Sequence, residues 1–318
     1  MRLALLSTAR INELLVAGAR RAAGVEVVAV GSRALARAEA EAARLGVPRA
    51  HGSYEELIAD PQADAVYVAL PNSLHTDWSI RALEAGKHVL CEKPLSRRPA
   101  DVARAYDAAE RAGRLLAEAF MWRHHPQAHR LEALVSEIGG ARLIRAAFSF
   151  PLDRPADIRL RAELDGGALM DVGCYCVSAA RLFAGEPTAV SAEQVLGGGV
   201  DVRMLATMRF PGDVLAYFDC GLDVALRDEL EVVGPEGALF CDDPWFSRAP
   251  GIELRRENRP LERIDVPAVD PFTCELEDFA AAVAGEREPR WGRDDALGQA
   301  RAIEALYQSA SNGGAVRL

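Results

Sequence analysis

The sequence lacks the cysteine patterns by which zinc and disulfide sites are usually recognised. Its six cysteines form no Cys-x-x-Cys pair, and none has the spacing to histidine that is typical of structural zinc. Cys174 and Cys176 are one residue apart, which suits neither a disulfide nor a shared metal ion well. We therefore expect reduced, mostly buried cysteines and no bound metal.

Positive charge and long apolar runs are also scarce. The 37 Lys and Arg residues are outnumbered by 47 Asp and Glu residues, so the net charge of -10 repels polyanions and anionic membranes. No apolar stretch approaches the roughly 20 residues of a membrane span, and residues 3–6 are too few for the apolar region of a signal peptide. These absences argue against nucleic-acid and membrane partners and favour a cytoplasmic protein.

The 318 residues, 50% of them hydrophobic, are enough for about two domains. In the first third, short apolar runs alternate with helical patterns, which is typical of βαβ units on a parallel sheet. The expected strands are 3–6, 25–30, 63–70, 88–91 and 115–119, and the expected helices are 13–23, 35–45, 75–85 and 101–112. Residues 1–120 are thus predicted to form an α/β domain with a mostly parallel sheet.

The rhythm changes after residue 120. A helix over 126–137 is followed by a series of alternating strand patterns with few helices between them. The expected strands are 142–150, 189–196, 202–210, 214–221, 229–233, 238–241 and 252–256, with a turn at 234–237 and closing helices at 274–283 and 294–309. Residues 121–318 are therefore predicted to form an α+β domain with a large, mostly antiparallel open sheet.

The turn between the first strand and the first helix has no glycine fingerprint. A dinucleotide site usually has Gly-x-Gly-x-x-Gly here, so that backbone N–H groups face the pyrophosphate. Ser7 and Ala9 replace the first two glycines, and Asn12 replaces the third small residue. We expect Ser7 to fit if its φ is not positive, and Asn12 to need a wider helix–strand contact or a polar contact with the cofactor. A strand followed by a helix is also common without any ligand.

The end of the second strand points to the identity of the cofactor. An acidic residue there would bind the ribose 2′-hydroxyl of NAD, but this chain has Ser32 and Arg33, with Arg37 one helical turn on. A hydroxyl and two guanidinium groups suit a 2′-phosphate, so NADP is favoured over NAD. Solvated arginines at the start of a helix are the ordinary alternative.

Lys93 follows the strand predicted over 88–91, within the segment Cys91-Glu92-Lys93-Pro94. Ligands of open parallel sheets bind at the carboxyl ends of the strands, where a lysine can donate to a substrate oxygen and stabilise a developing alkoxide. A surface lysine after a strand is the alternative interpretation.

A second group of candidate residues lies between Asp165 and Tyr175. The pair Gly166-Gly167 allows the backbone to pass close to another element, and the apolar run after it predicts a helix. That helix would place Asp171 and Tyr175 four residues apart on one face, where both can share a substrate hydroxyl. A tyrosine needs a nearby cation to act as a base near neutrality, and Lys93 can supply it. The alternative is a buried tyrosine on an ordinary helix.

Four segments in register carry a resemblance: residues 71–75, 92–94, 118–123 and 166–175. Together they resemble the Gfo/Idh/MocA oxidoreductase family over nearly the whole chain, especially the branch of glucose–fructose oxidoreductase, NADP-dependent xylose dehydrogenase and dimeric dihydrodiol dehydrogenase. The resemblance implies a dinucleotide-binding Rossmann domain over 1–120 and a substrate-binding and oligomerisation domain over 121–318, with the C-terminal helix packing back on the first. It also implies a homodimer or homotetramer.

The resemblance gives roles to individual residues. Lys93 would contact the reacting oxygen and Tyr175 would be the acid/base. Asp171, the third catalytic residue, would position the small polar substrate or support that pair, and Arg159 would contact the substrate. The cofactor-binding residues would be Ser7, Thr8, Ala9, Arg10, Ile11, Ser32, Arg33, Arg37, Leu70, Pro71, Asn72, His75, Glu92, Lys93, Trp122 and Arg123. The expected activity is NADP-dependent hydride transfer to or from a sugar or polyol. Two alternatives remain, an enzyme that passes hydride between two sugars on a tightly held cofactor, and a non-catalytic dinucleotide sensor.

Overall fold

The computed structural model describes residues 1–154 and 156–318, which form two compact units. Unit 1 contains Met1–Met121 and Asp270–Leu297, and unit 2 contains Trp122–Val269 and Gly298–Leu318. Pro155, which belongs to the loop expected between residues 151 and 165, lies outside the described residues.

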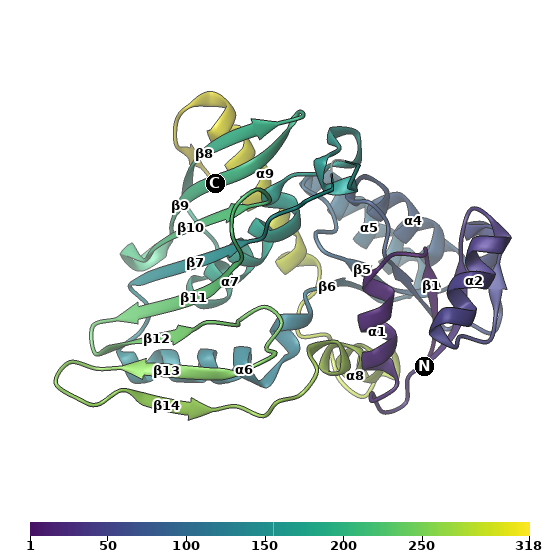
Figure 1. The fold of residues 1–318 in the computed structure, drawn as a ribbon, viewed down its shortest axis with the longest axis horizontal. Helices are drawn as coiled ribbons and strands as arrows, with labels where there is room; N and C mark the ends of the chain where they lie inside the picture. Colours follow the sequence, from purple (N-terminus) through teal and green to yellow (C-terminus); the bar gives the residue numbers. More distant parts are fainter. Residues whose placement is uncertain (155) are drawn as a thin grey trace. The chain divides into compact units, whose positions relative to one another are not determined.

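Unit 1 is built on a six-stranded sheet with the order β3-β2-β1-β4-β5-β6, and all of its strand pairs are parallel (Figure 1). The strands are β1 Arg2–Leu6, β2 Glu26–Gly31, β3 Ala50–His51, β4 Ala65–Val68, β5 His88–Glu92 and β6 Leu116–Ala119. This order reverses between β1 and β4, which is where ligands of such sheets bind. The predicted parallel α/β fold is confirmed, although β3 was missed.

The helices of unit 1 explain why its central strands are apolar throughout. They are α1 Ile11–Ala19, α2 Leu35–Leu45, α3 Tyr54–Ala59, α4 Asn72–Glu84, α5 Pro99–Ala112 and α8 Pro271–Val283, and α9 Arg293–Asn312 begins in this unit. Residues 3–6 of β1 and 65–68 of β4 are completely buried, as expected for strands covered on both faces. Helix α4 begins at Asn72, three residues earlier than predicted, because Pro71 already provides a suitable entry to the helix.

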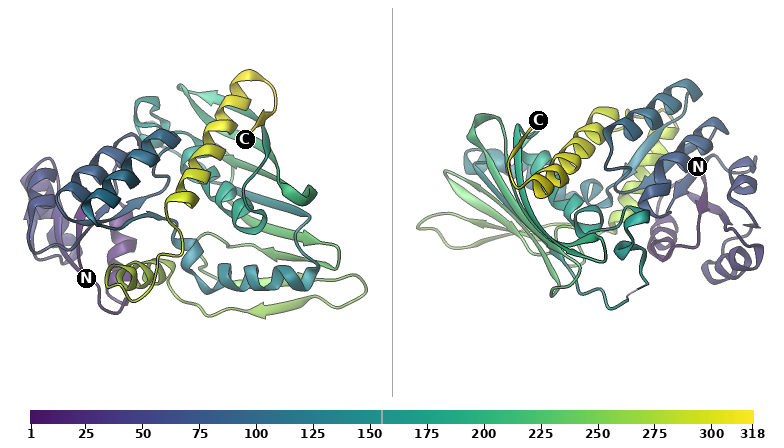
Figure 2. Two further views of the ribbon diagram at one scale, coloured as in Figure 1. Left: turned by 180° about the vertical axis from the view of Figure 1, so that it is seen from behind. Right: turned by 90° about the horizontal axis from the view of Figure 1, so that it is seen from above.

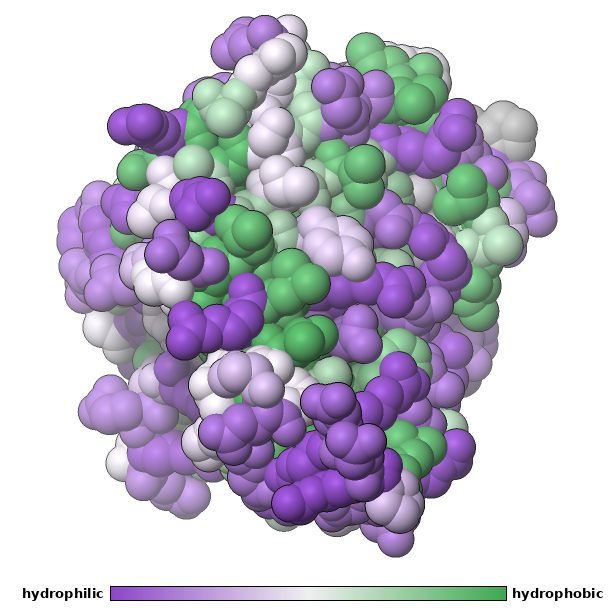
Figure 3. Space-filling view, turned by 90° about the vertical axis from the view of Figure 1, so that its left-hand side faces the viewer, coloured by the Kyte–Doolittle hydropathy of each residue, from purple (hydrophilic) through white to green (hydrophobic). Residues whose placement is uncertain are grey.

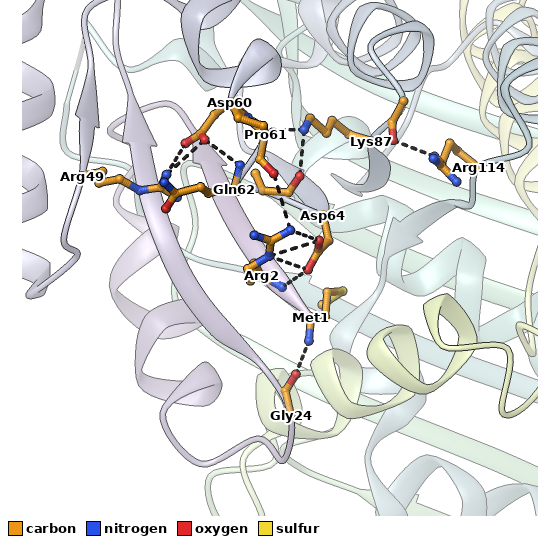
Figure 4. A network of polar contacts seen from close by, with 12 residues as sticks. Met1, Arg2, Gly24, Arg49, Asp60, Pro61, Gln62, Asp64, Lys87 and Arg114 are labelled. Atoms are coloured by element: carbon orange, nitrogen blue, oxygen red, sulfur yellow. Dashed lines mark hydrogen bonds and ion pairs between the residues drawn. The ribbon is translucent and has the colours of Figure 1, made fainter.

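A polar network connects the amino ends of the unit 1 strands, opposite the carboxyl ends where ligands of such sheets bind (Figure 4). Arg2 Nη2 lies 2.6 Å from Asp64 Oδ1, and the side chain of Arg49 pairs with Asp60. The buried Lys87 ammonium donates to the carbonyl oxygens of Asp60 (2.6 Å) and Ala63 (2.8 Å). Burial lowers the pKa of Lys87. These contacts tie the loop before β4 to the start of β5.

Unit 2 contains a nine-stranded sheet with the order β14-β13-β12-β11-β7-β10-β9-β8-β15. Its strands are β7 Leu143–Ser149, β8 Ala189–Gly197, β9 Val200–Arg209, β10 Leu215–Gly221, β11 Arg227–Gly234, β12 Gly237–Cys241, β13 Gly251–Arg255, β14 Glu262–Asp265 and β15 Val316–Arg317. Among the strand pairs described for this nine-stranded sheet, only β7 and β10 run parallel. The predicted mostly antiparallel sheet and the 234–237 turn are confirmed.

Helices cover one side of this sheet. They are α6 Pro126–Leu134, α7 Cys174–Ala184 and the later part of α9, and Figure 2 shows α7 and α9 on the same side of the strands. The other side carries exposed residues at alternate positions, including Leu205, Leu215 and Tyr217. The segment Ala162–Ala184 is long and apolar enough to cross a membrane by composition alone, but most of it is buried, as in the core helix of a globular unit.

The segment before α7 departs from the predicted helix. Leu169–Gly173 forms a π-helical turn, and α7 begins only at Cys174. The predicted helix is present, but its first turn is π-helical and not α-helical; that Asp171 and Tyr175 share one face stays a prediction. Such turns occur frequently at functional sites.

Candidate active site

The phosphate turn of unit 1 has a backbone that its sequence did not predict. Ser7, at the end of β1, has a φ of 141°, so the expectation of a non-positive φ is wrong. Its Oγ donates to the carbonyl oxygen of Ala69 (2.6 Å), and Asn12 Nδ2 donates to the Ser7 carbonyl oxygen (2.9 Å). Asn12 is fully buried and makes its polar contact with the turn itself; a contact with the cofactor, one of the two alternatives, stays a prediction.

The side chains predicted to bind a 2′-phosphate gather beside this turn. Arg37 Nη2 donates to Thr8 Oγ1 (3.3 Å), so the first turn of α2 reaches the phosphate turn. Ser32 is buried, whereas Arg33 and Arg37 are exposed. Burial raises the pKa of the Tyr54 phenol, and the neighbouring Arg33 and Arg37 guanidinium groups oppose that shift. One hydroxyl and two cations at this place form a donor set that fits a phosphate monoester.

The segment carrying Lys93 is held by side chains from three neighbouring elements. Tyr67 of β4 donates through its hydroxyl to Glu92 Oε1, directly before Lys93. Glu118 Oε1 of β6 accepts from the backbone N–H of Leu95 at 2.6 Å. Helix α4 adds a contact from His75 to Pro94, the residue after Lys93. The peptide bond between Lys93 and Pro94 is cis. Lys93 therefore stands on a fixed backbone at the carboxyl end of β5.

His75 connects this segment to the end of β4. Its Nδ1 lies 2.9 Å from the Pro94 carbonyl oxygen and its Nε2 lies 2.7 Å from that of Leu70. The side chain is buried, and burial, reinforced by the nearby Lys93 ammonium, lowers the pKa of the imidazole. Pro71 and Asn72 follow at the start of α4. His75 thus supports the backbone on which these predicted cofactor residues lie.

In unit 2, Tyr175 lies within a cluster of aromatic side chains. Its ring centroid is 5.3 Å from that of Phe148 and 5.7 Å from that of Trp245, with both rings inclined to it. Trp245 is fully buried and donates from its indole to the Ala147 carbonyl oxygen at 3.3 Å. Such packing restricts the phenol to one orientation.

Asp171 and Arg159 form an ion pair in the same unit. Arg159 Nε donates to Asp171 Oδ2 at 2.6 Å, and Nη1 lies 3.3 Å from Asp157 Oδ1. The two carboxylates, Asp171 foremost, raise the pKa of the Arg159 guanidinium further above its ordinary value. Both positions of the pair Gly166-Gly167 require glycine. A side chain at Gly166 would collide with the Arg159 carbonyl, and one at Gly167 would collide with Asp201. The predicted close backbone approach is confirmed.

Two residues predicted at the cofactor have buried contacts within unit 2. The indole of Trp122 packs edge-on against Trp245, with 5.4 Å between the ring centroids. Arg123 donates from Nη2 to the Ser178 carbonyl oxygen at 3.2 Å. Their contact with a cofactor remains a prediction.

Several residues around these groups were given no site role by the sequence analysis. Tyr54, Tyr67 and Glu118 support the unit 1 site, and Phe148, Asp157 and Trp245 support the unit 2 site. Tyr67 and Glu118 had a detectable signal, since each is a polar group inside a short, otherwise apolar strand. No group of three or more His, Cys, Asp or Glu residues within 1–154 and 156–318 is arranged to hold a metal ion.

The strand order of unit 1, with a phosphate-type donor set and a fixed lysine at its carboxyl edge, is that of a dinucleotide-binding oxidoreductase. Comparison with known proteins agrees. Residues 7–120 match a family model described as an oxidoreductase family with an NAD-binding Rossmann fold, and residues 130–240 match the GFO/IDH/MocA C-terminal domain. The chain belongs to the Gfo/Idh/MocA oxidoreductase family.

Relatives and solved structures extend the likeness over the whole chain. A D-xylose 1-dehydrogenase (NADP(+)) of Haloferax volcanii is 40% identical, with 100% of both chains covered. The crystal structure of a 3-ketoreductase from Actinomadura kijaniata in complex with NADP and TDP-benzene is similar with a TM-score of 0.91, 33% identity and 97% of each chain covered. An aldose-aldose oxidoreductase from Caulobacter crescentus, complexed with glycerol, is similar with a TM-score of 0.93, 27% identity, and 100% and 99% coverage.

Proposed function

We propose that this chain is an NADP-dependent oxidoreductase that oxidises a hydroxyl, or reduces a carbonyl, of a sugar or polyol. The observation that carries the proposal is the Lys93 segment at the carboxyl end of β5, which side chains of β4 and β6 hydrogen-bond and which His75 of α4 contacts at Pro94. The named activities of the xylose dehydrogenase and of the 3-ketoreductase support the same chemistry.

The cofactor proposed is NADP, with NAD disfavoured. Ser32, Arg33 and Arg37 would hold the 2′-phosphate. They supply a hydroxyl and two permanently charged guanidinium groups where an NAD enzyme has a carboxylate. The turn from Ser7 to Ile11 would meet the pyrophosphate at the start of α1. NADP, when bound, supplies or accepts the hydride.

The remaining chemistry is assigned to this chain's own side chains. Tyr175 would take the proton from the substrate hydroxyl during oxidation and return it during reduction. Lys93 would donate a hydrogen bond to the same oxygen and stabilise its negative charge. The Asp171 carboxylate, oriented by Arg159, would accept a hydrogen bond from a substrate hydroxyl.

Two substitutions test the proposal. Lys93→Met and Tyr175→Phe should each lower kcat by at least about a thousandfold, while NADPH binding stays within a few-fold of the wild type. Turnover is measured as NADP reduction with aldoses, deoxysugars, inositols and dihydrodiols, and as NADPH oxidation with keto-sugars. Near-normal turnover by either variant would remove that residue from the reaction.

The similarity to the aldose-aldose oxidoreductase favours a second candidate function. In it, the enzyme would pass hydride between two sugars on a cofactor that it retains. Such an enzyme would keep its nucleotide through purification and dialysis. If the purified protein is free of nucleotide and depends on added NADP, this candidate is rejected.

We also propose that the protein forms a homodimer or homotetramer through the uncovered face of the unit 2 sheet. Leu205 and Leu215 are 54% and 42% exposed on this face, and Tyr217 lies between them in the sheet register. Figure 3, seen from the side of the unit 2 strands, shows hydrophobic side chains gathered between hydrophilic ones. Leu205→Lys with Leu215→Lys should reduce the molar mass measured by light scattering to that of the monomer, whereas an unchanged mass would place the interface elsewhere.

A further inference from the structure

The phosphate turn holds a serine in a backbone conformation that usually requires glycine. The φ of Ser7 is 141°, within the range that side chains with a Cβ rarely adopt. Such a conformation persists only where the surrounding structure holds it in place. Ser7 is 7% exposed, so water does not provide that support.

Two buried side-chain contacts hold Ser7 from opposite sides. Its own Oγ donates to the carbonyl oxygen of Ala69, just beyond the end of β4. Its carbonyl oxygen accepts from Asn12 Nδ2, in the first turn of α1. The side chain of Ser7 and the peptide group that follows its Cα are thereby fixed to neighbouring elements.

Further hydrogen bonds close the turn on itself. The backbone N–H of Ala9 donates to Ser7 Oγ at 3.1 Å, and the backbone N–H of Asn12 donates to the Ala9 carbonyl oxygen at 3.1 Å. Asn12 is completely buried, and its Oδ1 has no hydrogen-bond partner among the described residues. A buried amide of this kind lowers stability unless its donor contact makes up for the unsatisfied oxygen. The Asn12 amide therefore has a specific task, which is to hold the Ser7 carbonyl.

We propose that Asn12 is a positioning residue, and that Ser7 and Asn12 together replace the glycine fingerprint by fixing the turn with side chains. The proposal rests on the NADP-binding function proposed above, because the fixed turn would present its backbone N–H groups to the pyrophosphate at the start of α1. In a glycine fingerprint, the first glycine supplies the backbone conformation and the third permits close packing. Here Ser7 takes that conformation only because Asn12 and Ala69 hold it. The two residues are therefore coupled, and neither can be replaced without affecting the other.

The test is a cycle of Asn12→Ala, Ser7→Gly and the double variant, measured on the full chain. Asn12→Ala alone should weaken NADPH binding by at least about tenfold, because the strained Ser7 loses its restraint. Ser7→Gly relaxes the backbone and should weaken binding less. When Ser7→Gly is already present, adding Asn12→Ala should change the dissociation constant by less than about threefold. Asn12→Leu, similar in shape but without a donor, should behave like Asn12→Ala, and the exposed Asn312→Ala serves as the matched control.

The melting temperature of the cofactor-free protein is the second readout. Asn12→Ala should lower it, and Ser7→Gly should remove most of that loss. If Asn12→Ala does not fold, recovery of a folded protein in the double variant supports the proposal, and failure of both overturns it. Equal effects of Asn12→Ala with and without Ser7→Gly, on binding and on melting, would also overturn it. If the wild type binds no NADPH, the proposed function fails, whereas the melting cycle still decides whether the two residues are coupled.

Discussion

Arg159 Nε and Asp171 Oδ2 lie 2.6 Å apart, which joins the loop after β7 to the π-helical turn before α7. The Asp171 side chain is 15% exposed and that of Arg159 39%, so the pair is only partly shielded from water. Because the two residues come from segments twelve positions apart, this ion pair orients the carboxylate that is proposed to meet the substrate.

Removing either partner should therefore impair catalysis more than folding. Arg159→Ala or Asp171→Asn is expected to lower kcat/KM for the best substrate by about 10- to 100-fold, mainly through KM, because one charge is left without its partner. Arg161→Ala is the matched control, since Arg161 is exposed and pairs with Glu163. Indistinguishable kinetics of the Arg159 and Arg161 variants would show that the ion pair has no role at the substrate.

Cofactor preference should depend on the side chains after β2. Ser32→Asp introduces a carboxylate where the 2′-phosphate is proposed to bind, and should weaken NADPH binding by at least about tenfold while affecting NADH much less. Titration of nucleotide fluorescence measures both dissociation constants. The exposed Arg111→Ala on α5 should change neither value, and an unchanged NADPH affinity in Ser32→Asp would place the 2′-phosphate elsewhere.

The chain has two lysines, and the structure gives them different tasks. Lys87 is buried and donates to two backbone carbonyl oxygens, so Lys87→Met should lower the free energy of unfolding by about 2–4 kcal/mol. Lys93→Met should instead lose turnover and keep its stability. Urea unfolding followed by circular dichroism compares the two variants. A Lys87→Met protein as stable as Lys93→Met would contradict the assignment.

Asp228 should make stability depend on pH. Burial, together with the neighbouring Asp243 carboxyl, raises the pKa of Asp228 to about 7, compared with about 3.9 in an unfolded chain. Between these values the folded state binds more protons than the unfolded state, so this group's contribution to stability falls as the pH rises from about 4 to about 7 and is constant above that.

Asp228→Asn should therefore be stabilised relative to the wild type as the pH increases across this window. Melting temperatures at several pH values between about 4 and about 8 give the difference. Asp213→Asn, at a side chain that is 94% exposed, should follow the wild-type curve. A constant difference between Asp228→Asn and the wild type at all pH values would refute the prediction.

The sequence predicted those parts of the fold that local patterns determine. The helix over 35–45 was predicted with its observed ends, because its apolar periodicity stops at Gly46, whose left-handed conformation ends the helix. The turn between β11 and β12 was predicted because Gly234-Pro235-Glu236-Gly237 is itself a turn sequence. Helix α3 was missed although it had a signal, since Ser53 accepts from the Glu56 N–H and Glu56 reaches back to Gly52, as in a capping box.

Other features depend on contacts that no local pattern specifies. The π-helical turn at 169–173 packs against β7, which ends twenty residues before it, and against β9 and β10, which begin more than twenty residues after it. The conformation of Ser7 depends on Ala69, sixty-two residues away. Strand β14 is short and rich in charged residues, so its pairing with β13 leaves little trace in its composition.

His75 lies between two carbonyl oxygens, and its tautomer determines which of them it hydrogen-bonds. A neutral imidazole carries one N–H and one lone pair, so it can donate either to Leu70 or to Pro94, but not to both at once. The choice of tautomer therefore decides whether the ring is bonded to the end of β4 or to the backbone next to Lys93. Nitrogen chemical shifts of this one ring would report, without any substrate, which of the two segments it holds.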